Sequence, residues 1–182
     1  MDILSHGLWA TVGSQVVDLK RKRKLNTWAA FFWGLFPDLF AFGPSFVWIA
    51  IGMMSGQFSL NDLPRPPHEL EPVPDSRIAM LQLSSQLYNY SHSLIIFGVV
   101  FGLVYLIRKR PVWEMLGWLL HILMDIPTHS YQFFPTPFLW PISGIKYNGI
   151  SWGQPWFLIS DYSLMLISFL IIRYLKQPRP RP

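Results

Sequence analysis

The chain has 182 residues, of which 51% are hydrophobic, 16% aromatic and 14% charged. With nine tryptophans and fourteen phenylalanines, this composition argues against a water-soluble globular protein, because so few polar groups could not cover its surface. The net charge of +5 does not indicate nucleic-acid binding, because the basic residues stand in short clusters between apolar runs and do not spread over a polar domain.

Three basic clusters lie at Lys20–Lys24, Arg108–Arg110 and Arg173–Arg181. This placement is typical of the cytoplasmic loops that flank membrane spans. A removable signal peptide is not expected, because Asp2 stands where such a peptide needs basic residues. The chain has no cysteine, so any metal site must use histidine and carboxylate ligands.

The first two apolar segments have different lengths and different breaks. The first, residues 3–17, is short for a membrane span. The second, residues 25–54, is interrupted by Pro37 and Pro44, and a proline inside a helix bends the helix axis. We therefore predict a kink at Pro37 that presents the carboxylate of Asp38.

Residues 55–76 are polar and contain five prolines, which predicts an extended loop outside the membrane. Its segment His68–Glu71 could fold over a site as a lid, although the composition favours a solvated loop. The third segment, Arg77–Ile107, begins amphipathic and becomes fully apolar after Ser93, so its first half is expected at the membrane surface.

The last two segments complete the predicted architecture. The fourth begins with Pro111 at a helix-opening position and ends near Ile126, before Pro127. The fifth, Trp156–Tyr174, is a span with Asp161 in its interior. The sequence thus predicts an all-α integral membrane bundle of about five helical segments. We expect one membrane-embedded domain over residues 1–176, followed by a proline- and arginine-rich tail over residues 177–182.

Seven ionisable side chains lie in or beside these apolar segments, although a charge inside a span costs about 2.5 to 3.5 kcal/mol. They are His6, Asp38, His92, His121, Asp125, His129 and Asp161. At about 1.5 Å of helix rise per residue, all but His129 lie roughly 16 to 24 Å from the nearest basic cluster. If the basic clusters share the cytoplasmic face, residues from five segments meet in one layer in the outer half of the bilayer.

Within this layer, His121 and Asp125 are four residues apart and project from one helix face. His129 continues that row if the helix survives Pro127, and otherwise lies in the following turn. Two imidazoles and a carboxylate suit zinc or a similar divalent ion. For the whole set, a metal site is favoured over polar side chains that only join helices.

Three neighbouring side chains have open roles. Asp161 could pair with a histidine or act as an additional ligand. Ser91 and Ser93 flank His92 and could orient its ring, although serines also serve in close helix packing.

The motifs resemble those of a family of bacterial inner-membrane metal-dependent hydrolases described as LexA-binding. The resemblance rests on His6, Pro37-Asp38, Ser91-His92-Ser93-Leu94, His121-x-x-x-Asp125-x-x-Thr128-His129, and Leu139-Trp140-Pro141 with Ser143. Their order is also similar to that of the zinc-dependent phospholipase C and single-strand nuclease superfamily. In that superfamily, ligands from several helices surround a cluster of zinc ions.

The resemblance implies a role for each matched residue. His92, His121 and Asp125 would hold one ion, and Asp125 would bridge to a second ion that His6 also binds. His129 would be a ligand of a further ion. Asp38 would position or deprotonate the attacking water. We expect one or two ions, most simply zinc, with manganese as the alternative.

We therefore expect a multi-pass protein of the bacterial inner membrane, with cytoplasmic basic loops and a site toward the outer leaflet. A site at that depth meets lipid headgroups, so the expected substrate is a phosphoester of a lipid or a lipid-linked molecule. Two other classes stay open. A non-catalytic regulator or binding protein would keep the metal in a closed four-ligand shell. A proton or metal transporter would need a polar path to both faces.

Overall fold

The computed structural model describes residues 1–20, 24–57 and 75–177. These residues form six α-helices and one short 3-10 turn, with no β-strand among them, which confirms the all-helical prediction. The elements are α1 (Ile3–Lys20), α2 (Thr27–Met54), α3 (Asp75–Ser91), α4 (Leu94–Arg108), η2 (Trp113–Met115), α5 (Leu116–Thr128) and α6 (Pro155–Leu175).

Two of these helices, α2 and α6, are long and apolar enough to cross a membrane. A third crossing is available if residues 79–91 of α3 and the whole of α4 count as one span that bends by 60° at its break. Exposed apolar side chains run along α6, with Ile159 at 69% and Leu166 at 61% exposure. These surfaces fit a lipid environment, so the structure is consistent with association with a membrane.

Several boundaries differ from the prediction, including that of the fourth segment, which does not begin as a helix at Pro111 but as the 3-10 turn at Trp113. The expected third segment is two helices, α3 and α4, because the chain turns at His92 and Ser93. Helix α3 begins at Asp75, inside the expected loop, and α5 carries Pro127 in its last turn instead of ending before it. The segment His68–Glu71, for which the composition favours a solvated loop over a lid, lies outside the described residues. Helix α2 runs through both of its prolines as one element, and the kink at Pro37 stays a prediction.

Helices α1, α2 and α5 approach one another through small residues. A Cβ atom at Gly34 of α2 would lie 2.6 Å from the His6 carbonyl oxygen and 2.8 Å from Ala10 Cβ, both on α1. A Cβ atom at Gly117 of α5 would lie 2.5 Å from the Ala30 carbonyl oxygen of α2. Small residues are what permits backbones to pack so closely in membrane proteins. This contact sets His6 of α1 beside the polar face of α5.

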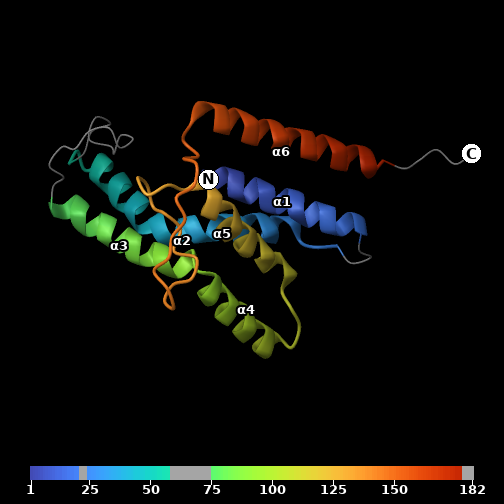
Figure 1. Ribbon diagram of the computed structural model, residues 1–182, viewed down its shortest axis with the longest axis horizontal. Helices are drawn as coiled ribbons and strands as arrows, with labels where there is room; N and C mark the ends of the chain where they lie inside the picture. Colours follow the sequence, from blue (N-terminus) through green and yellow to red (C-terminus); the bar gives the residue numbers. More distant parts are fainter. Residues whose placement is uncertain (21–23, 58–74, 178–182) are drawn as a thin grey trace, which may run out of the picture.

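The remaining helices pack around this centre (Figure 1). Helix α4 joins it through a buried apolar cluster formed by Phe97, Met115, Trp118 and Ile122. Helix α6 lies along α1 in the same direction and contacts it through Met165 and Ile172 against Val12 (Figure 1). Helices α2 and α3 lie side by side and extend to the opposite end of the molecule (Figure 1).

Candidate metal centre

Four ionisable side chains from separate parts of the chain meet in the interior. Asp38 comes from the middle of α2, His92 from the break between α3 and α4, and His121 and Asp125 from one face of α5. All four are at most 4% exposed. One oxygen or nitrogen atom of each lies within 4.8 Å of the corresponding atoms of the other three, so this group could hold a metal ion.

The distances within this group match those between the ligands of one small ion. The Nε2 atoms of His92 and His121 are 3.0 Å apart. Oδ2 of Asp125 lies 3.3 Å from Nε2 of His92 and 3.2 Å from Nε2 of His121. Oδ1 of Asp38 lies 3.5 Å from His92 Nε2 and 3.7 Å from His121 Nε2. Tetrahedral ligands at about 2.0 to 2.1 Å from zinc stand roughly 3.3 Å from one another.

Hydrogen bonds to the far sides of the rings fix the direction of the histidines. Nδ1 of His121 donates to the Gly34 carbonyl at 2.7 Å, and Nδ1 of His129 donates to the Phe134 carbonyl at 2.9 Å. Because a carbonyl oxygen can only accept, Nδ1 of both rings carries a proton, and Nε2 is the ring nitrogen that faces the site. The 3.0 Å contact between the Nε2 atoms of His92 and His121 therefore needs a proton or a cation between them.

The interior also contains polar atoms without a hydrogen-bond partner. Oδ2 of Asp38, Oδ2 of Asp125 and both ring nitrogens of His6 are buried, and no group of the described residues satisfies them by hydrogen bonding. A buried polar atom left in this state is costly, and native structures contain few of them. Oδ2 of Asp38 and Oδ2 of Asp125 belong to the four-residue group, so their lack of a hydrogen-bond partner favours a ligand bound there. The donor set, imidazole and carboxylate, fits a divalent ion of the zinc type.

Asp125 also faces a second set of nitrogen atoms through its other oxygen. Oδ1 lies 2.9 Å from Nε2 of His6, 3.2 Å from Nε2 of His129 and 2.5 Å from the amino group of Met1. The His6 ring stacks on the His121 ring with their centroids 3.5 Å apart. The structure thus brings together all six residues predicted as the principal site: His6, Asp38, His92, His121, Asp125 and His129.

Asp161 does not join this group. Its two oxygens accept hydrogen bonds from Ser5 Oγ at 2.8 Å and from Trp9 Nε1 at 2.7 Å, which ties α6 to the first turns of α1. The expected pairing with a histidine is therefore absent from its described contacts. Ser5 also contacts Asp2. Burial raises the pKa of Asp2, but hydrogen bonds from Ser5 and Tyr162 outweigh burial and hold that pKa below its ordinary value.

Tyr88 is a buried tyrosine that contacts two of the site histidines. Its ring stacks on the His92 ring at 3.6 Å between centroids, and its hydroxyl lies 3.4 Å from Nδ1 of His129 and 3.3 Å from Oγ1 of Thr136. The spacing of four residues between Tyr88 and His92 was the available signal, because it puts both on one helix face. No comparable signal marked Thr136 or the amino group of Met1.

No protein-family model, no curated protein and no solved structure matches this chain. The class of the protein therefore follows from its own fold and site. It is an all-helical protein with two or three helices suited to crossing a membrane, and it has a buried histidine and aspartate group that could bind a metal ion.

Proposed function

We infer that this protein is a membrane-embedded, metal-dependent hydrolase that cleaves a phosphoester of a lipid or lipid-linked substrate. The observation that carries the proposal is the position of Asp125. Its two oxygens face two different sets of imidazole nitrogens, one containing His92 and His121 and the other containing His6 and His129. A carboxylate between two ligand sets is suited to a pair of ions, the arrangement used for phosphoryl displacement.

The residues divide between two proposed ion positions. Asp38, His92, His121 and Oδ2 of Asp125 would hold the first ion, and His6, His129 and Oδ1 of Asp125 would contribute to the second. Imidazole and carboxylate favour zinc, with manganese as the alternative. An ion with an open coordination position supplies Lewis-acid activation of water and of the phosphoryl oxygen. Catalysis therefore requires that one proposed position be incompletely filled by protein groups.

Asp38 is the residue proposed to position the attacking water and to accept its proton. Its Oδ1 faces the two histidines, and its Oδ2 is buried without a hydrogen-bond partner among the described residues. A carboxylate with one oxygen held and one free can position a water molecule and accept its proton. Nδ1 of His121 and Nδ1 of His129 each donate to a backbone carbonyl, which leaves Nε2 of both rings to contact the proposed ions.

The phosphoester substrate is proposed from the depth of the site and from the motifs. The basic ends of the helices indicate the cytoplasmic side, so the buried group would lie toward the outer leaflet of a bacterial inner membrane. At that depth, lipid headgroups are the accessible substrates. The likeness of the His6, Asp38, His92, His121 and Asp125 motifs to inner-membrane metal-dependent hydrolases supports the same reaction class.

Metal analysis and lipid hydrolysis on the detergent-purified chain test this proposal. We expect one or two zinc or manganese ions per chain and release of a soluble phosphorylated headgroup from mixed phospholipids. His121→Ala and Asp125→Ala should remove both the metal and the activity. Asp161→Asn is the matched control, because it changes a buried carboxylate outside the ligand group and should keep both. Folded protein that neither binds metal nor hydrolyses lipid would refute the proposal.

A second candidate is a non-catalytic membrane regulator or binding protein with a structural metal. Burial favours it, because the four residues of the first proposed position are at most 4% exposed, as expected of a closed structural shell. The two candidates differ in the same experiment. A stoichiometric ion that stabilises the fold, with no hydrolysis of any phospholipid or lipid-linked phosphoester, would support the structural role and exclude the catalytic one.

A further inference from the structure

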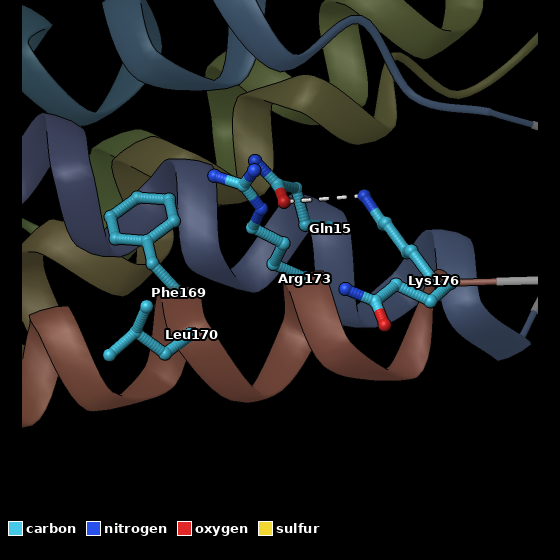
Figure 2. Close-up of a pocket in the computed structure, with 6 residues that line it drawn as sticks. Gln15, Phe169, Leu170, Arg173 and Lys176 are labelled. Atoms are coloured by element: carbon cyan, nitrogen blue, oxygen red, sulfur yellow. Dashed lines mark hydrogen bonds between the residues drawn. The ribbon is translucent and has the colours of Figure 1, made fainter.

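A groove between α1 and α6 lies away from the candidate metal centre, toward the basic C-terminal ends of both helices. It has a volume of about 530 Å³ and is lined by Gln15 of α1 and by Phe169, Leu170, Arg173, Lys176 and Gln177 at the end of α6. Figure 2 shows the side chains of Arg173 and Lys176 rising from α6 toward Gln15 on α1. The groove is thus apolar along one part and cationic at the other.

The two cations of this groove, Arg173 and Lys176, form no ion pair in the part of the chain that the structure describes. Nζ of Lys176 donates instead to the neutral Oε1 of Gln15 at 3.2 Å, which holds the ammonium group over the groove (Figure 2). Asp18, three residues after Gln15 on α1, does not line the groove and accepts a hydrogen bond from the backbone N–H of Leu25. Two neighbouring positive charges that form no ion pair with any described residue fit an anionic ligand.

The spacing along α6 sets these cations at the depth of lipid phosphates. Arg173 lies about 27 Å along the helix from Pro155, close to the roughly 30 Å thickness of a hydrocarbon core. Phe169 and Leu170 lie about one helical turn deeper, within reach of acyl chains. Phe169, Arg173 and Lys176 follow one another at spacings of four and three residues, so they share one face of α6.

We propose that this groove is a binding site for an anionic phospholipid, separate from the candidate metal centre and independent of the hydrolase proposal. The phosphate binds between Arg173 and Lys176, and one acyl chain lies against Phe169 and Leu170. Basic pockets between membrane helices on the cytoplasmic side are suited to such headgroups. The bound lipid lies beside the apolar contact between α1 and α6, in which Met165, Phe169 and Ile172 of α6 pack with Val12 of α1.

The test is a lipid titration of the detergent-purified full chain, followed by native mass spectrometry. The probes are phosphatidylglycerol and phosphatidylcholine with identical acyl chains, and free glycerol phosphate. We expect phosphatidylglycerol to bind at least tenfold more tightly than phosphatidylcholine. Glycerol phosphate should not compete at equal concentration, because it lacks the acyl chain. Equal binding of the two lipids, or competition by glycerol phosphate, would overturn the proposal of a lipid site.

Variants locate the binding. At about a fivefold contribution from each cation near the membrane surface, the Arg173→Gln/Lys176→Gln double variant should bind phosphatidylglycerol about twenty-five-fold more weakly. Arg108→Gln is the control, because it removes a cation from the end of α4, which does not line the groove. If the double variant does not fold, each single variant should show about a fivefold loss. Unchanged affinity in folded variants, or an equal loss in Arg108→Gln, would refute the assignment.

Discussion

Gly34→Ala tests whether the close contact between α1 and α2 sets the position of His6. The added Cβ would lie 2.6 Å from the His6 carbonyl oxygen, 2.8 Å from Ala10 Cβ and 3.1 Å from Gly7 Cα. All three neighbours belong to the backbone of α1 or to a side chain without rotamers, so none can turn aside. Ordinary contact begins at 3.4 Å, and α1 must therefore retreat by roughly 0.8 Å.

Overpacking of this kind costs about 1 to 3 kcal/mol. For a chain of this length, such a loss lowers the unfolding temperature by about 2 to 12 °C. The retreat of α1 also draws His6 away from Oδ1 of Asp125, now 2.9 Å from its Nε2. A protein that binds two ions should then lose the second ion more than the first, because His6 moves with α1, whereas the Gly34 carbonyl can still accept from Nδ1 of His121.

Thermal unfolding in detergent and metal content per chain measure both effects. Gly43→Ala is the matched control on the same helix, because a Cβ at Gly43 meets nothing within 4 Å. The control should be as stable as the parent or slightly more stable, since alanine is the better helix former. A Gly34→Ala protein with parental unfolding temperature and metal content would refute the reasoning, as would an equal loss in the control.

Three further predictions concern the surroundings of the site. Tyr88→Phe keeps the ring stack on His92 but removes a buried hydroxyl, so the unfolding free energy should fall by about 0.5 to 1.5 kcal/mol. The first ion should stay bound, and its loss would contradict the prediction. Trp9→Phe leaves an oxygen of Asp161 unpaired, which should lower stability by about 1 to 3 kcal/mol at unchanged metal content, and parental stability would argue against that hydrogen bond. A chelator should lower the unfolding temperature of the parent protein but not that of Asp125→Ala, whereas equal shifts in both would show that the chelator acts elsewhere.

The common layer of polar residues could be predicted because two regularities act together. Basic residues mark one end of the helices, and helix rise converts sequence separation into depth. Residues as distant as Asp38 and His92 were therefore expected at one level, and their closest site atoms lie 3.5 Å apart. The spacing of His121 and Asp125 gave their shared face in the same way.

The break before α4 could not be predicted from apolar periodicity, because the sequence has no proline or glycine there. Ser93 accepts hydrogen bonds from the backbone N–H groups of Ile95 and Ile96 at 3.1 and 3.2 Å, which opens a new helix. The Leu94 N–H donates to the carbonyl of Phe138 at 3.0 Å. This partner is supplied by a loop distant in sequence, so a local reading misses it.

The role of Asp161 depended on the rotation of α6 about its own axis. Depth alone put its carboxylate near the histidines. The packing of Met165 and Ile172 on α1 instead turns it toward Ser5 and Trp9. The rotation of a peripheral helix about its axis depends on which of its faces packs against the neighbouring helix. When apolar residues occur on all sides of the helix, the sequence does not indicate which face that is.

The gathering of Asp38, His92, His121 and Asp125 from three separate stretches of the chain has a mechanical consequence. A cation coordinated by all four side chains would act as a cross-link in a polypeptide that has no cysteine and therefore no disulfide. Cross-links that close long loops restrict the unfolded chain most. Loading of the ion and completion of the tertiary structure would then be one coupled event, and metal supply would govern how much mature protein accumulates.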